Sequence, residues 1–174
     1  MDCRKEFWLC TPNLGIQKKK YKQVVHNYKM EYEPLFQAGF KDIQETELRK
    51  VFVEPFDESE RREYLVTRFE ALLDRFKETG ISSEVWVDGS FSTKKPEPGD
   101  IDMIFFVDGQ EANNLPEEKK RILEELNDRN TSSIRYNCDV FIVPNHDLNM
   151  RSYWRGWFGF SRNEKPKGII RISI

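Results

Sequence analysis

The segment 85-VWVDGSFSTKKPEPGDIDMIFFVD-108 decides how the fold of this chain is interpreted. An apolar run resembling a β-strand ends at Gly89 and Ser90, and nine residues later Asp100 and Asp102 stand at the head of a second apolar run. Side chains at positions i and i+2 of a strand leave the same face, so the two carboxylates point together with Cα atoms roughly 6 to 7 Å apart. Such carboxylates repel each other, and without a cation the arrangement is costly.

A divalent cation would remove this cost. Mg²⁺ is the usual partner of a few carboxylates together with substrate phosphates, and Mn²⁺ is the alternative. Asp139 stands near the start of a later apolar run, 138-CDVFIVP-144, and would join the pair if the two strands are neighbours. Three carboxylates at one sheet edge suit two metal ions about 4 Å apart. We therefore predict Asp100, Asp102 and Asp139 as metal ligands.

The other half of the segment is typical of a phosphate site. A glycine directly after a strand lets the backbone turn sharply and approach a ligand, and the Ser90 hydroxyl with nearby amides would hold phosphate oxygens. Lys94, in the following loop, would meet the charge of a triphosphate, although a lysine in a polar loop is more often simply solvated. The predicted nucleotide-binding residues are Gly89, Ser90 and Lys94.

This spacing resembles the signature of the DNA polymerase β-like nucleotidyltransferase superfamily: Gly89-Ser90, nine residues, Asp100-Ile101-Asp102, then Asp139. The same segment, together with 154-WRGWFGFSRNEKPKGII-170, is similar to an uncharacterised bacterial family of small nucleotidyltransferase-like proteins. The resemblance implies a mixed sheet with flanking helices, as in the palm of polymerase β. It also implies Mg²⁺-dependent transfer of a nucleoside monophosphate from a nucleoside triphosphate to an acceptor, with release of pyrophosphate.

The resemblance further implies roles for single residues. Gly89 and Ser90 would bind the triphosphate, and Asp100 and Asp102 would hold the two metals. Asp139 would ligate the catalytic metal and favour deprotonation of the acceptor hydroxyl, which makes all three aspartates catalytic. Larger members of the superfamily carry a further helical domain, whereas 35 residues follow Asp139 here. The acceptor is therefore left open as a protein, an RNA or a small molecule.

Hydrophobic periodicity gives the fold class. A helix is predicted over 56–80, with Asp57 and Glu60 as a capping box at its start and Gly80 at its end. One face of this helix is apolar and is formed by Leu65, Phe69, Leu72, Leu73 and Phe76. A second helix begins near Pro116, and strands are expected at 84–89, 100–108, 136–144 and 168–174. This order predicts an α/β (α+β) fold, a sheet of mixed direction with helices on one face. The apolar runs "MIFFV" and "VFIV" predict central strands, buried on both sides.

Composition and charge limit the possible functions. The formal charge of −2 gives no global case for nucleic-acid binding, and the basic run "KKKYK" at 18–22 is most simply a solvated face. Cys3, Cys10 and Cys138 show no CxxC spacing, which argues against a disulfide framework and a zinc site. Charges at the N-terminus and the absence of a long apolar run predict a cytoplasmic protein without a membrane partner. Residues 1–42 are expected to form a peripheral extension to a domain over 43–174.

The aromatic tail leaves two interpretations open. Trp154, Trp157, Phe158 and Phe160 would stack on a base, or pack in the core, which is more common for such residues. Arg155, Arg162 and Lys167 flank them, and a basic residue near the metal site would offset phosphate charge.

Two alternative functions also stay open. One is a non-catalytic nucleotide-sensing or partner-binding module of the same fold, such as one half of a toxin–antitoxin or defence pair, which would act with a protein partner. The other is a nucleic-acid-binding domain that uses "KKKYK" and the aromatic tail.

Overall fold

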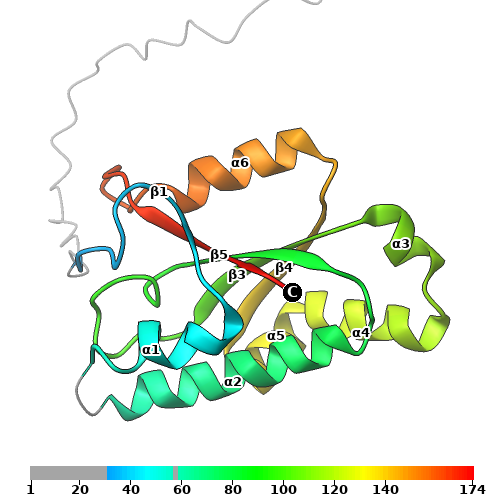
Figure 1. Cartoon of the computed structure of the whole chain (residues 1–174), viewed down its shortest axis with the longest axis horizontal. Helices are drawn as coiled ribbons and strands as arrows, with labels where there is room; N and C mark the ends of the chain where they lie inside the picture. The colour runs from blue at the N-terminus through cyan, green and yellow to red at the C-terminus, as the bar shows by residue number, and fades with distance from the viewer. Residues whose placement is uncertain (1–30, 57–58) are drawn as a thin grey trace, which may run out of the picture. The chain divides into compact units, whose positions relative to one another are not determined.

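The computed structural model describes residues 31–56 and 59–174, which form an α+β domain around a mixed five-stranded sheet (Figure 1). The strand order is β1-β5-β2-β3-β4. β2 runs antiparallel to both β3 and β5, whereas β1 is parallel to β5 and β4 is parallel to β3. The predicted mixed direction is thus confirmed. The strands are β1 Gly39–Asp42, β2 Ser83–Asp88, β3 Ile101–Val107, β4 Cys138–Pro144 and β5 Gly168–Ser173.

Helices cover both faces of this sheet. Successive side chains of a strand point to opposite faces of the sheet. The residues of β3 therefore contribute alternately to two separate hydrophobic cores. Phe105 packs with the first core, against α1, α2, α4 and α5, while Ile104 and Phe106 pack with the second, against α6. The helical segments are η1 Glu45–Glu47, α1 Leu48–Phe52, α2 Glu60–Lys77, α3 Gly109–Asn114, α4 Glu117–Asn127, α5 Arg129–Tyr136 and α6 Leu148–Phe158.

The expectation of helices on one face only is wrong. Figure 1 shows α6 alone on one side of the sheet, with α2, α4 and α5 on the other. Met150, Trp154 and Phe158 are spaced four residues apart, so they form one helical stripe that packs on the second face. This helix was not predicted from the sequence, because exposed aromatic residues lie between the buried ones and obscure the helical periodicity.

The run "VFIV" is also not central, because β4 is an edge strand of the sheet. Phe141 and Ile142 are only partly buried, and they pack at the margins of the two cores. Because helices cover both faces of the sheet, this edge strand is as apolar as a central one. Its composition therefore predicted a central strand. β3, with the run "MIFFV", is internal as predicted, and the centre of the sheet is β2.

The sheet domain begins earlier than residue 43. β1 lies inside the segment that was expected to be an extension, and it pairs residue by residue with β5. "KKKYK", Cys3 and Cys10 lie outside the described residues, as does Asp57 of the predicted capping box.

The ends of α2 are fixed at both sides. The Ser59 side chain accepts a hydrogen bond from the backbone N–H of Arg62 at the first turn. Gly80, with φ of +78°, ends the helical segment as predicted. In the part of the chain that the structure describes, no helix is both long and apolar enough to cross a membrane.

Candidate active site

Three aspartates form a row across the sheet. Asp88 is paired with Asp102 in the antiparallel register of β2 and β3, and Asp102 is paired with Asp139 in the parallel register of β3 and β4. Paired residues share a face, and this face is the one that α6 covers further along the strands. Because neighbouring strands lie about 4.8 Å apart, the row spans about 10 Å. The structure therefore brings Asp139 beside Asp102, as the spacing predicted.

Asp102 is the electrostatic centre of the row. Burial first, and then the negative charges of Asp100, Asp88 and Asp139, together raise the pKa of Asp102 to about 6. Lys167 opposes this rise through its positive charge. A carboxyl group held among three others therefore keeps its proton to a higher pH than an isolated aspartate does.

The Gly89 turn lies directly against Asp102. Gly89 has φ of +77°, and a Cβ atom at this position would lie 1.9 Å from Oδ2 of Asp102. Only glycine adopts this conformation without strain and leaves the carboxylate in place. The carbonyl of Ser90 accepts hydrogen bonds from the N–H and hydroxyl of Thr93, which closes the turn. The predicted phosphate turn and the carboxylate row are thus in contact.

Asp88, to which no metal role was assigned from the sequence, carries a buried ion pair. Lys167 Nζ lies 2.6 Å from Oδ1 of Asp88, and both side chains are less than a tenth exposed. Ser92 Oγ also donates to Asp88 Oδ1, at 3.2 Å. Burial raises the pKa of Asp88, while the charge of Lys167 and hydrogen bonds from Lys167, Gly89 and Ser92 work against that rise. Oδ1 of Asp88 is thus held by both Lys167 and Ser92, so Asp88 supports the turn rather than offering a free carboxylate.

Asp139 is only half engaged. Arg129 Nη2 lies 2.6 Å from Oδ2 of Asp139, and the Arg129 side chain is 76% exposed. Oδ1 of Asp139 is buried and has no hydrogen-bond partner. Arg129 carried no sequence signal, because its contact depends on how α5 is placed beside β4.

Asp100 and Lys94 lie at the margins of this site. Asp100 immediately precedes β3 and is exposed, yet its charge acts on Asp102. Lys94 Nζ lies 2.7 Å from Glu33 Oε2 in a surface ion pair, with 61% of the lysine side chain exposed. The structure therefore keeps Asp100 with the row and turns Lys94 toward Glu33.

The loop between Ser90 and Asp100 is anchored by Arg62, which the sequence analysis missed. This arginine is fully buried, and its guanidinium donates to the carbonyls of Phe91, Thr93 and Lys95. It also lies 3.5 Å over the ring of Phe56. Burial lowers the pKa of Arg62 to about 10, and the nearby charge of Glu97 partly offsets this. An arginine on an otherwise apolar helix face was the available signal.

The aromatic tail divides between core and surface. Trp154 and Phe158 are buried against the second face, whereas Trp157 is 65% and Phe160 48% exposed. The core-packing interpretation is confirmed for the first two. Cys138 is fully buried in the first core, where it packs as a small apolar side chain, and burial raises the pKa of its thiol.

Two residues of the row, Asp102 and Asp139, together with Asp100, carry the oxygen donors that a divalent cation prefers. Among residues 31–56 and 59–174, no three His, Cys, Asp or Glu side chains form a ready-made metal cluster as they stand. However, Oδ1 of Asp139 is buried without a hydrogen-bond partner, and Asp102 is buried among three other carboxylates, so each would gain from a bound cation. The residues that would hold it are Asp100, Asp102 and Asp139.

Comparison with known proteins gives one match. Residues 28–173 match the model of a protein family described as "Family of unknown function (DUF6932)". No curated protein and no solved structure matches the chain.

Proposed function

The chain belongs to the DUF6932 family, and we propose that it is a metal-dependent nucleotidyltransferase. It transfers a nucleoside monophosphate from a nucleoside triphosphate to an acceptor. The proposal includes the palm-like nucleotidyltransferase fold, for which the mixed sheet and the in-register aspartates are the support.

One observation carries this proposal. The turn at Gly89 packs against Asp102, which lies beside Asp139 on the next strand, so a phosphate turn and a carboxylate row meet at one point. A fold that needed only stability would not retain like charges opposite each other, because such pairs are destabilising. Their convergence on a glycine turn supports phosphate chemistry.

Each residue then has a distinct part. Asp100, Asp102 and Asp139 would hold Mg²⁺ or Mn²⁺, which when bound supplies a Lewis acid for the phosphoryl oxygens. The backbone amides after Gly89 hold the phosphates. Asp139 also orients the acceptor hydroxyl and favours its deprotonation.

The acceptor can be found with labelled substrates. The protein is incubated with each α-labelled nucleoside triphosphate, Mg²⁺ and a cell extract, and pyrophosphate and labelled product are measured. We expect both with the parent and neither with Asp102→Asn. Asp74→Asn, at an exposed position on α2, is the matched control and should react like the parent. Equal labelling by Asp102→Asn would reject the proposal.

A second candidate is a non-catalytic nucleotide-sensing module of the same fold. The observation that favours it is that two of the aspartates already have cationic side chains as partners. Arg129 contacts Asp139 and Lys167 contacts Asp88, so these carboxylates are neutralised without a metal ion. Such a module would bind a nucleoside triphosphate in a manner that depends on Asp102 and release no pyrophosphate with any acceptor. The labelling experiment therefore separates the two functions.

A further inference from the structure

A cationic side chain lies at each end of the aspartate row, and the two differ in how exposed they are. Lys167, beside Asp88, has 9% of its side chain exposed, whereas Arg129, beside Asp139, has 76% exposed. If a buried lysine separates from its partner, an unpaired charge remains in the interior, at a cost of several kcal/mol. In the other pair the arginine is largely exposed while the Asp139 side chain is 15% exposed, so Arg129 can return to solvent and leaves its partner more easily than Lys167 does.

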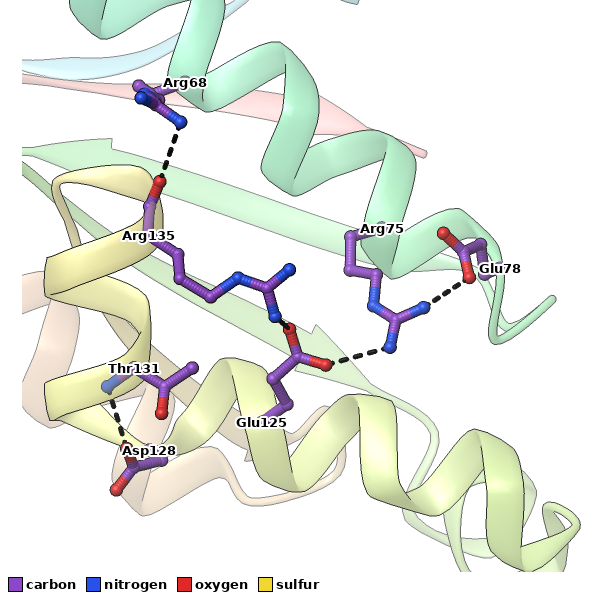
Figure 2. A network of polar contacts seen from close by, with 7 residues as sticks. All are labelled: Arg68, Arg75, Glu78, Glu125, Asp128, Thr131 and Arg135. Atoms are coloured by element: carbon purple, nitrogen blue, oxygen red, sulfur yellow. Dashed lines mark hydrogen bonds and ion pairs between the residues drawn. The ribbon is translucent and has the colours of Figure 1, made fainter.

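The backbone of Arg129 is nevertheless held firmly. α5 begins at this residue, and the side chain of Asp128 caps the helix by accepting from the N–H of Thr131 at 2.8 Å. Figure 2 shows this cap together with the polar contacts that join α5 to its neighbours. The Arg135 side chain pairs with Glu125, and the backbone carbonyl of Arg135 accepts a hydrogen bond from the Arg68 guanidinium. The exposed guanidinium therefore extends from a helix start that is held in place, within reach of Asp139.

The contact with Arg129 leaves Asp139 incompletely satisfied. One oxygen, Oδ2, accepts from Arg129 at 2.6 Å, while Oδ1 is buried with no partner. A carboxylate oxygen without a partner in a buried position is costly. A metal ion would satisfy Asp139 better than the guanidinium does, and Arg129 would then lose its only recorded anionic partner among the described residues.

We propose that Arg129 is a substrate-binding residue, which covers Asp139 in the free protein and contacts a phosphate of the nucleoside triphosphate once a divalent cation occupies Asp139. This inference rests on the proposed function. Arginine suits the role because its planar fork matches phosphate oxygens and stays charged. Arg129 stands at the β4 end of the row and the Gly89 turn at the β2 end, so the phosphates would be held from both sides.

The proposal predicts changes of opposite sign in one variant. In Arg129→Gln, the affinity for Mn²⁺ alone should rise by about two- to fivefold, because an exposed ion pair no longer competes for Asp139. In the same variant, the affinity for inorganic tripolyphosphate at saturating Mg²⁺ should fall by about tenfold or more, because a charged hydrogen-bond donor is lost. Mn²⁺ binding is measured by electron paramagnetic resonance and tripolyphosphate binding by calorimetry.

Arg121→Gln is the matched control, since it removes the same charge from an exposed position on α4. It should leave both affinities within twofold of the parent. Arg129→Lys should retain part of the tripolyphosphate affinity. If Arg129→Gln leaves both affinities unchanged, or moves them in the same direction, the proposal is overturned.

Asp102→Asn separates this inference from the function on which it rests. If Asp102→Asn abolishes binding of tripolyphosphate while Arg129→Gln behaves like the parent, the inference fails and the proposed site stands. If Asp102→Asn binds like the parent, or the parent binds no tripolyphosphate, the proposed function fails and the inference falls with it.

Discussion

Asp102 and Asp139 lie opposite each other on the parallel strands β3 and β4, so two carboxylates share one face of the sheet at adjacent positions. Like charges in this arrangement repel each other. The fold limits the cost with Arg129 at one end of the row and Lys167 at the other. Asp102, between them, forms no ion pair with any described residue, and burial together with the neighbouring negative charges raises its pKa.

The stability of the metal-free protein should therefore fall as pH rises. Asp102 has a pKa of about 6 in the folded chain against an ordinary value of 3.8, so between these values the folded state binds more protons than the unfolded state. Stability decreases with rising pH wherever the folded state binds more protons than the unfolded state. The free energy of unfolding should therefore decrease as pH rises, by about 3 kcal/mol in total. Urea denaturation between pH 4 and pH 8 measures this loss.

Asp102→Asn should remove most of this dependence and be more stable than the parent at pH 8. The exposed Asp74→Asn is the control, and its pH profile should follow that of the parent. A profile for Asp102→Asn as steep as the parent profile would show that the repulsion in the row is relieved in some other way.

Lys167→Met should destabilise the protein by about 3 to 5 kcal/mol, because it leaves the buried Asp88 carboxylate without its cation. The double variant Asp88→Leu, Lys167→Met should recover most of this loss, since apolar residues often replace a buried ion pair at little cost. Lys120→Met, at a surface pair with Glu117, should change stability by less than about 0.5 kcal/mol. Chemical denaturation of the four proteins tests these expectations, and a double variant no more stable than Lys167→Met would contradict them.

The sequence was informative where chemistry depends on local spacing. The Asp-x-Asp pair and the Gly-Ser turn lie within one segment, and the position of Asp139 followed from assuming that β3 and β4 are neighbours. Asp88 was not assigned to the row, because its place opposite Asp102 depends on the register between β2 and β3. That register is a property of the assembled sheet, which no short pattern contains.

Contacts made by long charged side chains were the least predictable. Arg129 reaches Asp139 only because α5 packs beside β4, and Lys167 reaches Asp88 only because β5 inserts next to β2. Lys167 was one of three basic residues considered for offsetting phosphate charge, and nothing in the sequence showed the direction of its side chain. Both contacts arise from tertiary placement, so they could not be read from periodicity or composition.

Gly89→Ala should damage the site more than the fold. The added Cβ would lie 1.9 Å from Oδ2 of Asp102, and φ of +77° costs a residue with a side chain about 1 to 2 kcal/mol. The carboxylate must move, so we expect loss of Mg²⁺-dependent tripolyphosphate binding in calorimetry.

Gly156→Ala is the matched control for this change. Gly156 lies inside α6 with nothing within 4 Å of an added Cβ, and alanine there should stabilise the helix by about 0.5 to 1 kcal/mol. Tripolyphosphate binding equal to that of the parent in Gly89→Ala would mean that the turn does not shape the phosphate site.

Arg62→Lys should loosen the loop that joins the glycine turn to the aspartates. The guanidinium donates to the carbonyls of Phe91, Thr93 and Lys95 at once, and an ammonium cannot reproduce that fork. Carbonyls left buried without partners should cost about 3 kcal/mol or more in the free energy of unfolding. Amide hydrogen exchange over residues 91–99 should accelerate, and tripolyphosphate affinity should fall because the turn loses its support. Arg68→Lys, an exposed change on the same helix, should alter neither, and unchanged exchange in Arg62→Lys would show that Arg62 stabilises the core without holding the loop.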